Sequence, residues 1–211
     1  MKKVILSLVT VALLAGCFGP KRDIRVACVG DSITEGMGIS WQSSNAYPVQ
    51  LDSILGEGFE VMNFGRSATT MMYTGDFPYW SAKEFTNAFR FHPDIIVIKL
   101  GTNDAKLFQW NEEKFVSSYQ QMIDSFLTIR PMPVIKVCLP VPVVEDKWEI
   151  TDSVVTYGVI PEVRKVATDN NLEVIDLNAV MSKHKDLYVD GVHPTREGAR
   201  YIAEEVARHI R

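Results

Sequence analysis

The chain has 211 residues, of which 46% are apolar, and its formal net charge is −4. This length suits one domain that buries its own core without disulfide or metal staples. The acidic balance excludes the basic footprint of a nucleic-acid-binding protein. No repeat, low-complexity run or proline-rich linker marks an internal boundary.

The N-terminal residues have the pattern of an export signal. Two lysines precede an apolar run over 4–16, which is shorter than the roughly 20 residues of a helix that spans a bilayer. The run ends in Leu-Ala-Gly-Cys, which resembles the bacterial lipobox and predicts cleavage just before a lipidated Cys17. An ordinary signal peptide that is cut nearby is the alternative. We therefore expect an exported bacterial lipoprotein of the cell envelope, with signal peptide 1–16, a short membrane tether 17–23 and a folded domain 24–211.

Five short runs rich in β-branched residues are predicted strands, and each is almost continuously apolar. Strands that are covered on both faces have this character. Segments between and after them are long enough for amphipathic helices. The predicted strands are 23–30, 59–65, 94–101, 133–140 and 172–177, and the predicted helices are 46–56, 110–130, 157–171 and 194–210. This alternation predicts a three-layer α/β/α domain with a parallel sheet.

Small, polar and titratable residues lie at or after the ends of separate predicted strands. They are Gly30-Asp31-Ser32, Asn63-Phe64-Gly65, Gly101-Thr102-Asn103-Asp104 and Asp190-Gly191-Val192-His193. The carboxyl ends of parallel strands meet at one edge of the sheet, where functional groups gather. We expect these residues to converge there as a nucleophile, an oxyanion hole and a base.

Ser32 has two compatible interpretations. Together with Glu35 it fits the capping box S-x-x-E, in which the serine begins a helix. It also suits a nucleophile, because backbone N–H groups at a helix start lie beside its oxygen and can bind a developing anion.

His193 is a candidate base, although a histidine by itself is more often a surface or core residue. Asp190 lies three residues earlier, across Gly191, and can reach Nδ1 of the ring. Nε2 would then be free to take a proton from Ser32. The alternative for Asp-Gly is a plain turn.

Asn103 and Gly65 are candidate oxyanion donors. The side-chain amide of Asn103, with the backbone N–H groups of Gly65 and Ser32, would supply three donors to a tetrahedral intermediate. A loop asparagine that tolerates a left-handed conformation and a tight-turn glycine are the alternatives.

Four motifs occur in the order of the four sequence blocks of the SGNH hydrolases, also called GDSL esterases. They are Gly-Asp-Ser-Ile-Thr, Gly65 of Asn-Phe-Gly, Gly-Thr-Asn-Asp and Asp-Gly-Val-His-Pro, and the resemblance extends over about 24–206. It implies that Ser32 is the nucleophile, His193 the base and Asp190 its orienting acid. It also implies oxyanion donors at Ser32, Gly65 and Asn103, and no metal or organic cofactor.

The family resemblance implies a flavodoxin-like, five-stranded parallel sheet in the order 2-1-3-4-5. The strands of Cys28 and Cys138 would then lie two positions apart, at roughly 10 Å. This distance excludes a disulfide, which needs Cα atoms within about 7 Å.

Within this family the segments YPVQL, NFGRSATTM and GTNDAK resemble those of sialate O-acetylesterase-like members, including bacterial carbohydrate deacetylases. Trp80, Trp110 and Trp148 follow strand ends and could form a rim on which sugars stack, with core packing as the alternative.

We expect removal of short acyl groups, above all O-acetyl groups, from carbohydrate through an acyl-Ser32 intermediate. One alternative is a lysophospholipase or thioesterase, which a membrane tether would favour. The other is a non-catalytic glycan-binding lipoprotein, against which the intact set of Ser32, Asn103, Asp190 and His193 argues.

Overall fold

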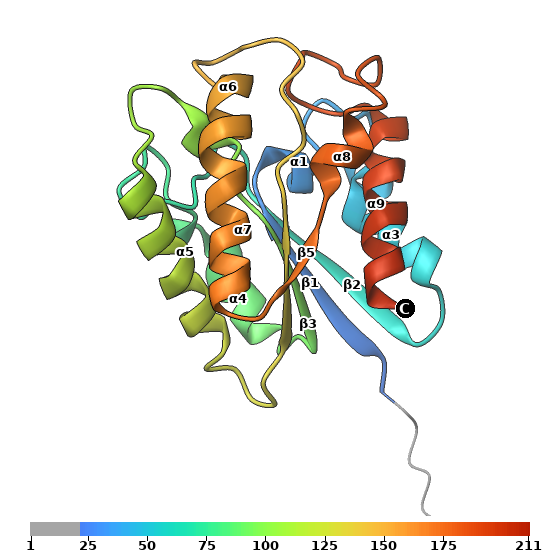
Figure 1. Cartoon of the computed structure of the whole chain (residues 1–211). Coiled ribbons are helices and arrows are strands. Elements are labelled where there is room, and N and C mark those ends of the chain that lie inside the picture. Colours follow the sequence, from blue (N-terminus) through green and yellow to red (C-terminus); the bar gives the residue numbers. More distant parts are fainter. Residues whose placement is uncertain (1–21) are drawn as a thin grey trace, which may run out of the picture.

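Five parallel strands form a single sheet in the computed structural model, which describes residues 22–211 (Figure 1). Their order is β2-β1-β3-β4-β5, which confirms the order that the family resemblance implies. The strands are β1 (Ile24–Gly30), β2 (Phe59–Gly65), β3 (Ile95–Lys99), β4 (Val134–Cys138) and β5 (Glu173–Ile175). The predicted signal peptide and Cys17 lie outside the described residues.

Helices cover both faces of the sheet, as the continuously apolar strands predict. Figure 1 shows α4 (Lys83–Arg90), α5 (Glu112–Phe126) and α7 (Ile160–Asp169) on one side, and α3 (Tyr47–Leu55) and α9 (Arg196–Ile210) on the other. Alternate residues of β1 divide between the two cores: Ala27 and Val29 join the first, and Val26 and Cys28 the second.

The remaining helical segments are short and lie in the connections. They are α1 (Ser32–Glu35), α2 (Gln42–Asn45), η1 (Tyr79–Ser81), η2 (Asn103–Ala105), α6 (Asp152–Val154), η3 (Val155–Val159) and α8 (Leu177–Met181). The predicted helix 157–171 therefore begins earlier, because Thr151 caps α6 by accepting a hydrogen bond from the Val154 N–H at 3.4 Å, and a π-turn joins α6 to α7.

Cys28 and Cys138 are both free and buried. They lie on β1 and β4, which β3 separates, so the expectation that they form no disulfide is confirmed. Burial raises the pKa of the Cys28 thiol to about 12, so this side chain behaves as a small apolar residue. Across 22–211, no helix has both the length and the apolarity needed to cross a membrane.

Candidate active site

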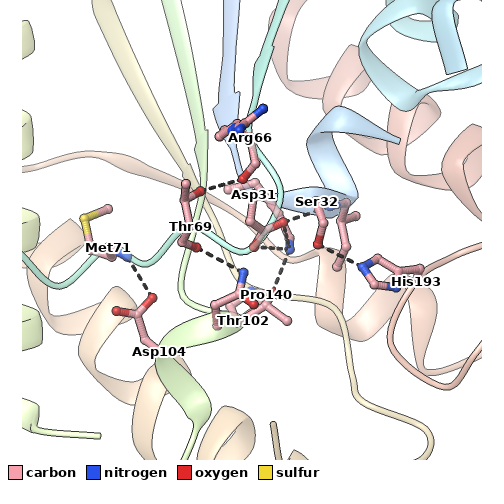
Figure 2. A network of polar contacts seen from close by, with 12 residues as sticks. Asp31, Ser32, Arg66, Thr69, Met71, Thr102, Asp104, Pro140 and His193 are labelled. Atoms are coloured by element: carbon pink, nitrogen blue, oxygen red, sulfur yellow. Dashed lines mark hydrogen bonds and ion pairs between the residues drawn. The ribbon is translucent and has the colours of Figure 1, made fainter. Parts of the chain in front are cut away.

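The side chains of Ser32, His193 and Asp190 form a continuous hydrogen-bonded chain. Nε2 of His193 lies 2.9 Å from Oγ of Ser32, and Nδ1 lies 2.8 Å from Oδ2 of Asp190. Figure 2 shows the serine and histidine side chains pointing toward one another. Both residues are buried, at 7% and 6% exposure, so little water competes for this contact. The arrangement can transfer a proton from the hydroxyl to a ring whose orientation is fixed.

Asp31, rather than Ser32, caps the first helix. Its Oδ1 accepts a hydrogen bond from the Ile33 N–H at 3.0 Å, whereas Glu35 accepts from the Ser67 N–H at 2.7 Å. The capping-box interpretation of Ser32 and Glu35 is therefore wrong. Aspartate and serine are both good N-caps, and the sequence alone does not say which one begins the helix. Because Asp31 takes this role, the oxygen of Ser32 is available to His193.

The loop that carries the histidine is organised by Asp190. Oδ1 of this residue accepts hydrogen bonds from the N–H groups of Val192, at 3.0 Å, and His193, at 2.8 Å. Gly191 between them has φ +87°, a conformation that favours glycine. Burial by itself would raise the pKa of Asp190, but the bonds from His193 and Val192 outweigh burial and lower this pKa below its usual range. The carboxylate therefore stays ionised next to the ring.

Gly65 lies against α1, the helix that begins with Ser32, but the N–H group of Gly65 is already engaged. It pairs with Gly30 across β1 and β2, and its N–H donates to Oδ1 of Asn63 at 2.8 Å. A Cβ at this position would lie 2.1 Å from the backbone nitrogen of Glu35. A glycine is thus required here by the close approach of α1 to β2. For Gly65 to act as the predicted oxyanion donor, its N–H would have to break the hydrogen bond to Asn63 or share it with the substrate.

A turn that the sequence analysis missed lies next to Asn103. Nδ2 of Asn103 donates to the Thr69 carbonyl at 3.0 Å, and Oγ1 of Thr69 donates to the Arg66 carbonyl at 2.7 Å (Figure 2). Inside this turn Ala68 has φ +65°, which is unusual for a residue with a side chain. Among residues 22–211, the Ala68 N–H donates to no acceptor. Nothing in the local sequence signals this conformation.

Buried charges lie directly behind the nucleophile. Nζ of Lys99 lies 3.0 Å from each carboxylate oxygen of Asp31 and 2.7 Å from Oγ1 of Thr102, and both charged side chains are fully buried. Asp104 accepts hydrogen bonds from the N–H groups of Met71, at 2.8 Å, and Met72, at 2.7 Å. Burial raises the pKa of Asp104 to about 7 despite these bonds. These contacts join the loops after β1 and β3 to the segment after β2.

The three tryptophans proposed for a sugar-binding rim have different surroundings. Nε1 of Trp80 donates to the Met71 carbonyl at 3.1 Å, and the ring packs against the first core. The ring of Trp110 packs against Phe115 with centroids 5.2 Å apart. These contacts favour the packing interpretation for both.

Trp148 alone of the three lies beside the hydrogen-bonded chain. Its ring centroid is 5.4 Å from that of His193, and its side chain is 52% exposed. Trp41, which the sequence analysis did not select, is 82% exposed with φ +58°. Its loop contains Gly38, and a Cβ at Gly38 would contact Val189 near the histidine. Across 22–211, no group of three or more His, Cys, Asp and Glu side chains is arranged to hold a metal ion.

One known protein matches the sequence over most of the chain. The chain is 41% identical over 212 residues to an acetylxylan esterase of Xylanibacter ruminicola. The match covers 91% of this chain but 44% of that protein, so the chain spans less than half the length of its relative.

Solved structures share the fold at lower identity. A carbohydrate acetylesterase from Sinorhizobium meliloti superimposes with a TM-score of 0.73 at 20% identity, over 90% of this chain and 98% of that one. An acetyl xylan esterase gives 0.70 at 22% identity, over 89% and 100% of the two chains. The aryl esterase of M. smegmatis gives 0.73 at 20% identity, over 88% and 97%.

A family model covers most of the chain. The model of the GDSL-like lipase/acylhydrolase family matches residues 28–201, a range that contains Ser32, Asn103, Asp190 and His193. This match agrees with the resemblance that the sequence motifs indicate. The parallel sheet, and the contacts among the serine, histidine and aspartate at its edge, agree with it as well. The chain therefore belongs to the GDSL-like lipase/acylhydrolase family.

Proposed function

We propose that this protein is a serine esterase that removes O-acetyl groups from carbohydrate. The observation that carries the proposal is the ring of His193, placed 2.9 Å from Oγ of Ser32 and 2.8 Å from the carboxylate of Asp190. This is the arrangement that activates a serine hydroxyl for attack on a carbonyl carbon. The family and the acetylxylan esterase relative support the ester and carbohydrate parts of the proposal.

In the proposed reaction, Oγ of Ser32 attacks the acetyl carbonyl carbon while Nε2 of His193 takes the hydroxyl proton. The tetrahedral intermediate collapses when the bond to the sugar oxygen breaks, and His193 returns the proton to that oxygen. Water then attacks the acetyl-Ser32 ester by the same route, which releases acetate and restores the serine. Asp190 holds the ring in the required tautomer throughout.

The carbonyl oxygen needs donors where its negative charge develops. Ser32 is the first residue of α1, so its N–H has no acceptor inside the helix. Asn103 donates one amide hydrogen to Thr69 and keeps the second for a ligand. We assign the third donor to Ala68 in the adjacent turn, because the N–H of Gly65 is engaged by Asn63. Asn103→Ala is expected to lower kcat by about 100- to 1,000-fold.

Trp148 is the proposed platform for the sugar. Its half-exposed ring stands next to His193, and an indole face stacks well on the apolar face of a pyranose. Trp148→Ala is expected to raise KM for acetylated xylan while changing KM for p-nitrophenyl acetate little. The matched comparison is Trp110→Ala, which removes a packed tryptophan ring and so shows the effect of lost stability.

The proposed reaction is tested by acetate release from acetylated xylan and by hydrolysis of p-nitrophenyl esters from acetyl to palmitoyl. The mature protein is expected to prefer short acyl chains, and Ser32→Ala to abolish turnover without unfolding the domain. A preference for long chains would replace the proposal with a lipid hydrolase. No turnover and no labelling by a serine-directed phosphonate would replace it with a glycan-binding protein.

We also propose that Cys17 carries a lipid that anchors the mature chain to a membrane of the cell envelope. The support is the lipobox pattern of the sequence, ahead of a tether of a few residues. Metabolic labelling with a palmitate analogue should mark the wild type and leave Cys17→Ala unlabelled. Equal labelling of the two chains would contradict the proposal.

A further inference from the structure

Lys99 is a charged side chain in an otherwise apolar buried strand. It ends β3, whose other residues are isoleucine and valine, and its exposure is 0%. Its ammonium group makes three hydrogen bonds, one to each oxygen of Asp31 and one to Oγ1 of Thr102. These contacts use all three donors of the group. Burial lowers the pKa of Lys99, although the carboxylate of Asp31 opposes this shift.

Stability alone does not account for this ion pair. Removing a lysine and a carboxylate from water is costly, and replacing a buried pair by apolar side chains is often neutral or stabilising. The neighbouring residues of β3 are apolar and fully buried, so an apolar side chain would suit the same environment. The loops to which its partners belong indicate a second role for Lys99.

Each partner of Lys99 belongs to a loop that also carries a residue of the proposed catalytic machinery. Asp31 caps α1 through the Ile33 N–H at 3.0 Å, and Ser32 lies between these two residues. Thr102 immediately precedes Asn103, whose amide contacts Thr69 at 3.0 Å. Lys99 therefore joins the loop of the nucleophile to the loop of the oxyanion donor, and its three hydrogen bonds go to neither Ser32 nor His193.

We propose that Lys99 is a positioning residue that fixes the Ser32 amide relative to the side chain of Asn103. The inference rests on the proposed esterase function. A displacement of these donors by about 1 Å is enough to lower turnover on the order of 100-fold. Substrate is held by other groups, so the loss should fall on kcat while KM changes little.

The test is the double variant Lys99→Met/Asp31→Asn. Methionine has similar length without a charge, and asparagine keeps an oxygen for the Ile33 N–H, so neither buried charge is left unpaired. The single variant Lys99→Met leaves the Asp31 carboxylate unpaired and is expected to unfold more easily. Removal of both charges should restore stability but not kcat, which we expect to remain about 100-fold below wild type on p-nitrophenyl acetate.

A matched control comes from the adjacent strand. Lys136 of β4 is also buried and pairs with Glu173 of β5. In register it lies beside Val97, two residues before Lys99, and away from the strand ends. Lys136→Met/Glu173→Gln is expected to keep the wild-type kcat.

Hydrogen exchange separates failure of this inference from failure of the esterase proposal. In a stable Lys99→Met/Asp31→Asn variant, two backbone amides should exchange faster than in wild type, whatever ester the protein cleaves. They are the N–H of Ile33, which donates to Asp31, and the N–H of Ala105, which donates to the Thr102 carbonyl at 3.3 Å. Wild-type kcat in the double variant would overturn the inference. If the wild type proves inactive on every ester, unchanged exchange at those two amides would overturn it instead.

Discussion

Nδ1 of His193 lies 2.8 Å from Oδ2 of Asp190, and the other oxygen of the same carboxylate accepts the backbone N–H of His193, also at 2.8 Å. One carboxylate thus fixes both the ring and the backbone of the proposed base. The three-residue separation allows this because Gly191 turns the chain back with φ +87°.

Asp190→Asn should separate the orienting role of this carboxylate from its place in the fold. Asparagine can still accept the two backbone N–H groups, but its amide can present a donor to Nδ1 and favour the wrong ring tautomer. We expect kcat to fall by about 10,000-fold, with a melting temperature close to that of wild type. Hydrolysis of p-nitrophenyl acetate and thermal unfolding measure the two effects. A variant with wild-type kcat would remove Asp190 from the mechanism.

The main features of the fold were predictable because they depend on runs of residues. Continuous apolar segments such as 23–30 indicate strands that are covered on both sides, and the order of the elements indicates a parallel sheet. The contact between Ser32 and His193 was expected from the rule that the ends of parallel strands share one edge. Thr195 caps the last helix, with its oxygen 3.2 Å from the Gly198 N–H, as threonine at a helix start commonly does.

The features that were missed depend on contacts between distant segments. Lysine in an apolar strand gives no sign that it is neutralised by Asp31, 68 positions away. The sequence around Trp80 and Trp110 does not distinguish these residues from Trp148. Only the tertiary packing of their rings does. The engagement of the Gly65 N–H by Asn63 is a side-chain hydrogen bond that no motif records.

Gly65→Ala should be destabilising because of steric overlap. The added Cβ would lie 2.1 Å from the Glu35 nitrogen and 2.6 Å from its Cα, so α1 must move away from β2. We expect a loss of about 3 kcal/mol in the free energy of unfolding, measured by urea denaturation. Gly58→Ala is the comparison, because Gly58 has φ +89° but no atom within 4 Å of an added Cβ. A smaller loss at Gly65 than at Gly58 would contradict this account.

Ala68→Gly should stabilise the protein while its activity is retained. A residue with a side chain at φ +65° is strained by about 1–2 kcal/mol, and glycine removes this strain at a smaller entropic cost in the unfolded chain. The net gain should be about 0.5–1 kcal/mol, and kcat should stay near wild type because the N–H is kept. Asn171→Gly, at φ +54° just after the C-cap of α7, is the matched control. Equal stability of Ala68→Gly and wild type would show that the turn carries no strain.

Asp104 should make stability depend on pH in the direction opposite to an exposed ion pair. Burial raises its pKa from 3.8 to about 7, so between these pH values the folded protein holds a proton that the unfolded chain has released. Stability from this group is therefore greatest at low pH and falls as pH rises toward 7, by about 1.4 kcal/mol per pH unit. Above pH 7 both states are ionised and the contribution is constant.

The variant Asp104→Asn isolates this contribution, because it removes the titrating group and keeps the size of the side chain. Urea denaturation of wild type and variant between pH 4 and 8 gives the difference in unfolding free energy at each pH. The unfolding free energy of wild type should fall relative to that of the variant from pH 4 to 7, and the difference should then level off. Asp124→Asn, at an exposed position of α5, shows how much the loss of a surface carboxylate contributes. If the difference for Asp104→Asn were the same at every pH, the bonds from Met71 and Met72 would have to hold the carboxylate ionised in spite of its burial.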